Sequence, residues 1–135
     1  MEFFDTYREI LRCELVYATG CTEPIAIAYA AAVARQTLGA MPERLVVLCS
    51  GNIVKNVKSV IVPGTGGLRG IEAAALIGAV GGDAGAGLNV LHGVTEAHRA
   101  ETAALLESGA CSVGLLESEE PLQRQFAVLE LEIFC

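Results

Sequence analysis

The chain has 135 residues, of which 53% are hydrophobic, and its formal net charge is -7. This length and apolar fraction suit one domain with its own core, whereas the acidic balance and the lack of a Lys/Arg cluster argue against nucleic-acid binding. The longest apolar stretches, residues 25–34 and 71–80, are interrupted and too short to span a bilayer. Residues 1–5 have no basic n-region, so we expect no signal peptide and a cytoplasmic protein.

The N-terminal third of the chain predicts two helices. Residues 2–16 are typical of an amphipathic helix, because apolar and charged residues recur there at helical spacing. A glycine turn follows, and residues 25–38 form an apolar, alanine-rich run that predicts a second helix. Pro24 suits its first turn because proline has no N–H group, and Thr22 or Glu23 can provide the N-terminal cap.

The remainder of the chain alternates short strands with helices. The predicted strands are residues 45–49, 88–91, 111–116 and 126–134, residues 60–62 are extended, and the predicted helices are residues 53–59, 68–80 and 95–108. This mixture predicts an α+β fold in a single compact domain over residues 1–135. Because a globular domain seldom stops in mid-strand, we expect the chain to be truncated, the N-terminal portion of a larger protein.

Five scattered cysteines offer neither a disulfide framework nor the ligand spacing of a zinc site. Cys13, Cys49 and Cys111 have apolar neighbours, so we expect them to be buried thiols. Cys135 ends a strand-like run and has no assigned role. Cys21 differs because it lies on a glycine turn at a helix N-terminus, where the helix dipole favours the thiolate that binds a metal or attacks carbon.

A second polar segment follows the strand at residues 45–49. Ser50 and Asn52, on either side of a glycine, offer small polar side chains and backbone N–H groups at a strand end, a frequent place for binding small anions. Lys55 can meet a carboxylate there, although a solvated lysine in an ordinary turn is the simpler alternative. Glu72, in an apolar helix, is either a buried functional carboxylate or a residue of the exposed helix face.

Two further features have less specific interpretations. The glycine-rich residues 64–67 lack the spacing of a phosphate-binding loop, so we expect a hinge or a lid over an active site. His92 and His98 are six residues apart, which is wrong for a metal pair on one helical face, and we expect both to lie on the surface.

Several separated motifs together resemble a known family. They occupy residues 20–26, 50–60, 62–63, 66–67 and 70–74. They look like the N-terminal part of the iron–sulfur L-cysteine desulfidases, relatives of the iron–sulfur L-serine dehydratase α chain. The resemblance implies a [4Fe–4S] lyase, independent of pyridoxal phosphate, that converts L-cysteine to pyruvate, ammonia and hydrogen sulfide. Some members of the family are expected to use L-serine instead.

The resemblance also implies roles for individual residues. Cys21 aligns with the N-terminal cluster ligand of the family, and Thr22, Ser50, Asn52 and Asn56 match positions expected to bind the substrate. Removal of the substrate α-proton requires a base of lysine or carboxylate type, for which Lys55 and Glu72 are the candidates. The family's other two cluster ligands lie in a C-terminal region absent from this sequence. We therefore expect this chain alone to lack the cluster and the activity, and to need a C-terminal half or a partner chain.

Two alternatives remain open from the sequence. The first is that the chain is a stand-alone small-molecule-binding or oligomerisation module that lost its catalytic half. A weaker alternative is an enzyme with Cys21 as its nucleophile, although no histidine is recognisably placed as its base. Whether the chain is a fragment of the lyase or a stand-alone module, a missing half would leave apolar surface exposed. We therefore expect a homo-oligomer in either case.

Overall fold

The computed structural model describes residues 2–17, 20–116 and 131–134. Five α-helices, one 3-10 helix and three strands occur in this part of the chain. In chain order they are α1 (Glu2–Glu14), α2 (Thr22–Leu38), β1 (Leu45–Cys49), α3 (Gly51–Val57), α4 (Gly70–Gly81), η1 (Ala84–Asn89), α5 (Glu96–Ser108), β2 (Cys111–Leu115) and β3 (Leu131–Phe134). The mixture of helices and strands confirms the α+β fold in a single compact domain.

The local sequence signals placed most of these elements correctly. The strand predicted at residues 45–49 has those bounds, and the second helix ends at Gly39, which adopts the left-handed conformation with φ 76°. The N-cap prediction was wrong, because Cys21 itself occupies that position and Thr22 is the first helical residue. Of the last predicted strand, residues 131–134 are confirmed and residues 126–130 lie outside the described residues.

The strand predicted at residues 88–91 is wrong. Residues 84–89 form a 3-10 helix, and a turn follows it. The Asp83 side chain accepts a hydrogen bond from the Gly85 N–H at 2.9 Å, and Gly87 has a φ of 57°, so the backbone coils tightly here. A short apolar run does not distinguish a strand from a buried coil, and these local bonds decide the outcome.

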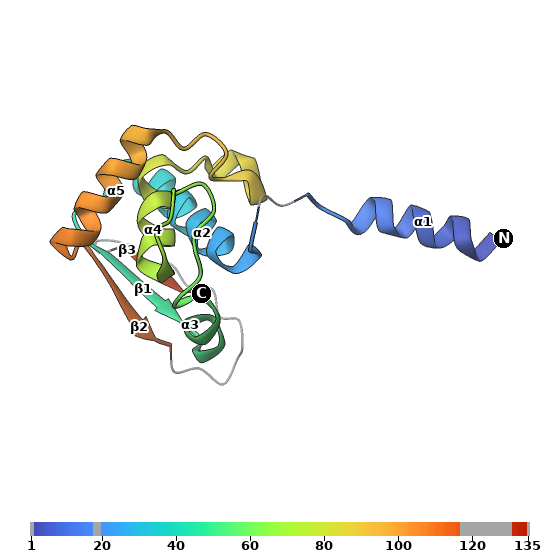
Figure 1. The fold of residues 1–135 in the computed structure, drawn as a ribbon, viewed down its shortest axis with the longest axis horizontal. Helices are drawn as coiled ribbons and strands as arrows, with labels where there is room; N and C mark the ends of the chain where they lie inside the picture. Colours follow the sequence, from blue (N-terminus) through green and yellow to red (C-terminus); the bar gives the residue numbers. More distant parts are fainter. Residues whose placement is uncertain (1, 18–19, 117–130, 135) are drawn as a thin grey trace.

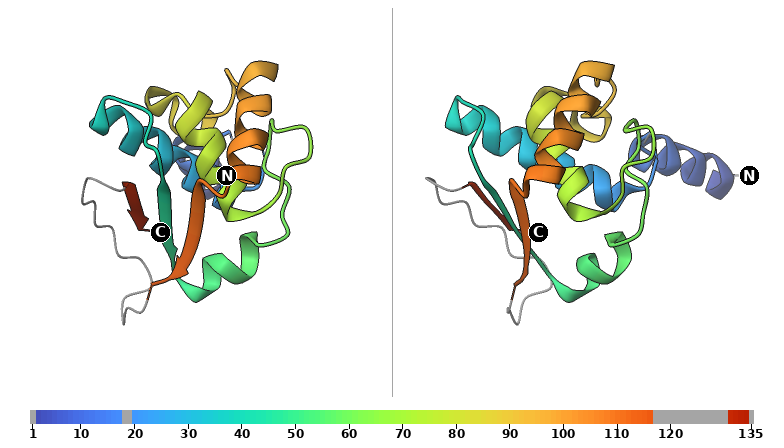
Figure 2. Two further views of the ribbon diagram at one scale, coloured as in Figure 1. Left: turned by 90° about the vertical axis from the view of Figure 1, so that its left-hand side faces the viewer. Right: turned by 60° about the vertical axis from the view of Figure 1, so that its left-hand side comes forward.

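The three strands form a parallel sheet in the order β2-β1-β3. Leu45 of β1 pairs with Cys111 of β2 and with Leu131 of β3. Along β1 the side chains alternate, so that Leu45 and Cys49 are buried while the intervening Val46 is only half-buried. Figures 1 and 2 show the long helices α2, α4 and α5 gathered on one side of the sheet, with α3 beyond the C-terminal end of β1.

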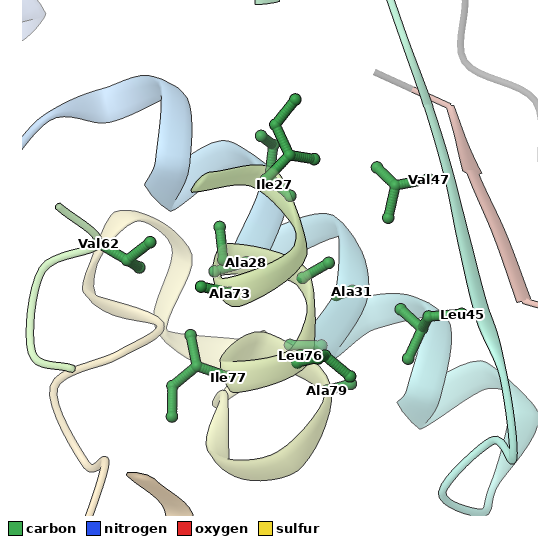
Figure 3. Packing of buried hydrophobic residues seen from close by; sticks show 14 of the residues in the cluster. Ile27, Ala28, Ala31, Leu45, Val47, Val62, Ala73, Leu76, Ile77 and Ala79 are labelled. Atoms are coloured by element: carbon green, nitrogen blue, oxygen red, sulfur yellow. The ribbon is translucent and has the colours of Figure 1, made fainter. Parts of the chain in front are cut away.

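The core is built around the contact between α2 and α4. Small residues line this contact, and Figure 3 shows Ala28, Ala31 and Ala73 where the two helices meet. The approach is closest at Gly78, where an added Cβ atom would overlap the carbonyl oxygen of Ala28. Small side chains allow the two backbones to come this near, and larger residues such as Leu76 fill the space around them.

Helix α1 is separate from this core. Figure 1 shows it standing away from the other elements, and its side chains are exposed from residue 3 onward. Within the described residues, none of the helices combines the length and the apolar character needed to cross a membrane.

Candidate functional site

Cys21 is the first residue of the candidate site. It is the N-cap of α2, with an extended backbone (φ -61°, ψ 126°), and its side chain forms no capping hydrogen bond. The thiol is exposed, as is the neighbouring Thr22. The glycine turn therefore presents a solvent-accessible sulfur at a helix N-terminus, as the sequence predicted.

One hydrogen bond joins this turn to the second polar segment. The Asn56 Nδ2 group of α3 donates to Oε1 of Glu23 in the first turn of α2, at 2.9 Å. The two residues are 33 positions apart in the chain. The bond places the C-terminal end of α3 beside Glu23. The motif at residues 20–26 and the motif at residues 50–60 are therefore in contact.

A third motif reaches the same place through Pro63. A Cβ atom added to Gly20 would lie 2.5 Å from Cγ of Pro63, which is closer than real side chains approach. Only glycine lets the turn before Cys21 lie against this proline without displacement. The turn that carries Cys21 is therefore held against Asn56 through Glu23 and against Pro63 through Gly20.

The other predicted binding residues lie on α3 or at its start. Ser50 is the N-cap of this helix and is half-buried, but its side chain forms no capping hydrogen bond. Asn52 and Lys55 are exposed. Within the described part of the chain we find no ion pair of Lys55, so its ammonium group is available to a ligand.

Glu72 does not join this group through any contact in the described residues. It lies half-buried in the first turn of α4. Its exposure is therefore intermediate between the buried carboxylate and the exposed surface residue that the sequence left open. Its carboxylate acts electrostatically on Cys111, at the start of β2. The sheet register sets Cys111 level with Leu45, whereas Ser50 follows the opposite end of β1.

Burial, and to a smaller extent the negative charge of Glu72, raise the pKa of the Cys111 thiol from an ordinary 9.0 to about 12. The folded protein therefore keeps this proton at pH values where the unfolded chain loses it. We expect stability to fall above pH 9, by up to about 1.4 kcal/mol per pH unit, until the pH approaches the folded pKa.

Denaturant unfolding at several alkaline pH values tests this expectation. The Cys111→Ala variant should show a shallower loss of stability between pH 9 and 11 than the parent, whatever its stability at pH 7. The Cys13→Ala variant is the matched control, because that thiol is exposed, and it should keep the parental slope. Equal slopes for the parent and Cys111→Ala would contradict the assignment.

The remaining cysteines only partly follow their predictions. Cys49 is fully buried, as expected, and Cys111 is half-buried. The prediction for Cys13 was wrong, because this residue lies exposed on α1, a helix that is not covered by the core. Cys135 lies outside the described residues.

The glycine-rich segment 64–67 is held by specific hydrogen bonds. The buried Thr65 hydroxyl donates to the Val62 carbonyl at 2.7 Å and accepts from the Leu68 N–H at 3.1 Å. The Arg99 Nε–H donates to the carbonyl of Gly64 at 2.7 Å. These bonds favour a fixed wall of the site over the lid expected from the sequence.

A small cavity lies beside residues 63–64, at the start of this segment. Its volume is about 200 Å³, and it is lined by Pro63, Gly64, Leu91, His92, Val94 and Arg99. Sequence reasoning missed Arg99, because only its pairing with Glu96 three residues earlier is visible in the sequence. Its bond to Gly64 spans 35 positions and depends on the fold.

His92 is exposed, as predicted, but the prediction for His98 was wrong. His98 Nδ1 accepts from the Thr95 N–H at 3.2 Å, and Thr95 Oγ1 accepts from the His98 N–H, so the two residues form a capping box at the start of α5. Its ring also packs against Gly81 of α4. His98 is thus a partly buried structural residue.

The described residues do not form a complete cluster site. No group of three or more His, Cys, Asp or Glu side chains among them is arranged to hold a metal ion. A [4Fe–4S] cluster of the implied type needs three thiolates, and this surface offers Cys21 alone. The described side chains therefore fit at most one ligand position of such a cluster.

These features define an α+β domain that presents an exposed cysteine at a helix N-terminus, beside a polar surface assembled from three separated motifs. No family model matches the chain. It is similar to the UPF0597 protein of Lachnoclostridium phytofermentans, with 56% identity over 114 residues, which are 84% of this chain and 27% of that protein.

Two further UPF0597 proteins show the same relation. The protein of Treponema denticola is 60% identical over 94 residues, covering 70% of this chain and 22% of its own length. The protein of Finegoldia magna is 50% identical over 116 residues, covering 86% of this chain and 28% of its own length. The chain thus spans about a quarter of the relatives it matches. No solved structure matches it.

Proposed function

We propose that this chain is the N-terminal portion of a [4Fe–4S]-dependent L-cysteine desulfidase or of a related L-serine dehydratase-like lyase. The observation that carries the proposal is the hydrogen bond from Asn56 to Glu23, which unites two of the resembling motifs beside the exposed Cys21. The contact of Gly20 with Pro63 adds the third motif. Residues from three separated motifs thus meet at the turn that carries one exposed thiol.

In this proposal Cys21 supplies one cluster ligand, and residues outside this chain supply the others. A bound cluster of this kind provides a Lewis acid that activates the substrate. The coverage of about a quarter of the relatives' length leaves ample sequence for the missing ligands. Because a thiol ligand must stay reduced, we place the enzyme in the cytoplasm.

The polar side chains of the Cys21 turn and of the α3 segment have a natural role in holding a small amino acid. Thr22, Ser50 and Asn52 can exchange hydrogen bonds with its ammonium and carboxylate groups. Lys55, which has no ion pair within the described residues, can bind the carboxylate or accept the α-proton in its neutral form. We favour Lys55 over Glu72 as the base, because the interactions of Glu72 within the described residues connect it electrostatically to Cys111 and not to the Cys21 turn.

Anaerobic iron–sulfide reconstitution tests this function. The chain is prepared alone and together with the part of the Lachnoclostridium phytofermentans protein that it does not match. We expect a cluster absorption band, sulfide release from L-cysteine and pyruvate formation only in the mixture, and L-serine serves as the competing substrate. No cluster in either preparation would reject the proposal and favour a stand-alone binding or oligomerisation module.

A further inference from the structure

Helix α1 carries an apolar face with nothing packed on it in the described structure. Its side chains Phe3, Phe4, Tyr7, Ile10 and Leu11 are between 51% and 77% exposed. At about 100° per residue these five positions occupy roughly one third of the helix circumference. Leu15, Val16 and Tyr17, directly after the helix, are also exposed and continue the apolar surface toward Cys21.

The opposite side of α1 carries charged, exposed side chains. Arg8 lies 3.8 Å from Asp5, and Arg12 lies 3.6 Å from Glu9, in exposed ion pairs three residues apart. Apart from Glu14 at the C-terminal end of the apolar face, the helix thus has one charged face and one apolar face, which is the pattern of a helix that packs on a protein surface.

An isolated helix of this length is marginally stable in water, since most helix stability in proteins comes from the packing of an apolar face. Two phenylalanines and a tyrosine left in solvent also form an apolar patch of the kind that marks an interaction site. The face of α1 therefore requires a covering surface, and the core of residues 22–115 does not provide it.

We propose that the apolar face of α1 docks onto the part of the longer protein that lies outside this chain. The relatives are about four times as long as the matched stretch, so a large surface is available in the same protein. The position of α1 supports this occupant, because the helix is joined by a short segment to the turn that carries Cys21. Docking of α1 would hold that turn against the remainder of the protein.

A second copy of the chain is a less suitable partner for the apolar face of α1. Each chain carries a net charge of -7, so two copies repel one another at low ionic strength. The inference goes beyond the proposed function, because docking needs neither a cluster nor a substrate.

The first test is binding between two polypeptides. The 135-residue chain is co-expressed with the unmatched part of the Lachnoclostridium phytofermentans protein and analysed by size-exclusion chromatography with light scattering. We expect a 1:1 complex that the double variant Phe4→Asp/Leu11→Asp weakens at least 100-fold. The control variant Glu9→Ala/Arg12→Ala, on the charged face of the same helix, should bind within about 3-fold of the parent.

The variants also separate docking from folding. Because α1 stands outside the compact domain, both double variants should keep the melting temperature of the parent chain. Self-association of the parent through α1, without binding to the other polypeptide, would overturn the proposal in favour of a second copy. Failure of the parent to bind either one, together with equally rapid amide exchange of α1 in one continuous full-length chain, would overturn it as well.

A single-chain measurement covers the case in which the two pieces do not assemble. This chain replaces the matched stretch in the Lachnoclostridium phytofermentans protein, and amide hydrogen exchange of α1 is compared with that in the 135-residue chain. We expect at least 100-fold slower exchange in the chimera, whereas equal rates would reject docking. Protection of α1 in a chimera without desulfidase activity would support the docking and reject only the proposed function.

Discussion

Replacing Cys21 by serine is expected to abolish cluster formation in the mixture of this chain with the remainder of a full-length relative. A serine hydroxyl is a poor iron ligand beside a thiolate, and no second cysteine lies at this turn. The substitution changes one exposed atom, so the fold should be unaffected. We expect the visible absorption band to be lost and sulfide release from L-cysteine to fall at least 1000-fold.

The matched control is Cys13→Ser. Cys13 is also an exposed free thiol, but it lies on α1, outside the surface that joins Glu23, Asn56 and Pro63. This variant should keep the parental absorbance and activity. Equal losses in the two variants would indicate a general effect of thiol removal, and an unchanged Cys21→Ser variant would reject the ligand role.

The second large effect is expected on stability, from Gly78→Ala. The new methyl group would overlap the Ala28 carbonyl oxygen, which belongs to the backbone of α2 and is unable to rotate away. Helices α2 and α4 must separate, and the buried residues around them lose contact. Overpacking of this kind costs about 2–3 kcal/mol, although alanine by itself favours a helix over glycine by about 1 kcal/mol.

Thermal and denaturant unfolding measure this effect. The net loss of about 1–2 kcal/mol predicts a melting temperature lower by roughly 5 °C for Gly78→Ala. Gly93→Ala is the control, because a Cβ atom at Gly93 meets no atom within 4 Å, and its stability should stay within about 0.5 kcal/mol of the parent. A stable Gly78→Ala variant would show that the two helices tolerate a wider separation.

Local sequence signals were enough for most of the secondary structure. The alanine-rich run before Gly39 and the Thr95 cap mark helix ends through backbone geometry and hydrogen bonds within a few residues. The β-branched run at residues 45–49 is similarly self-contained. The same reasoning failed at residues 88–91, where bonds of Asp83 and Gly87 override a short apolar run.

The sequence pointed to candidate residues, but it did not show the contacts between the segments that carry them. Cys21 was identified because a glycine turn and a helix start are both visible in the sequence. Two hydrogen bonds join residues far apart in the chain: Asn56 to Glu23 over 33 positions, and Arg99 to Gly64 over 35 positions. The hydrophobic periodicity of the sequence does not predict contacts over such separations. Glu72 likewise lies beside Cys111 because the packing of α4 against β2 sets their positions.

By itself, the sequence determined most of the order of helices and strands, the class of the fold and the exposed cysteine turn, because each depends on interactions between near neighbours. The tertiary structure decided the parallel order β2-β1-β3, the close contact of α2 with α4, and which thiols are buried. Those properties arise from packing between distant segments. For the same reason the amphipathic pattern of α1 predicted a helix correctly, yet only the structure showed that its apolar face has no cover within the described residues.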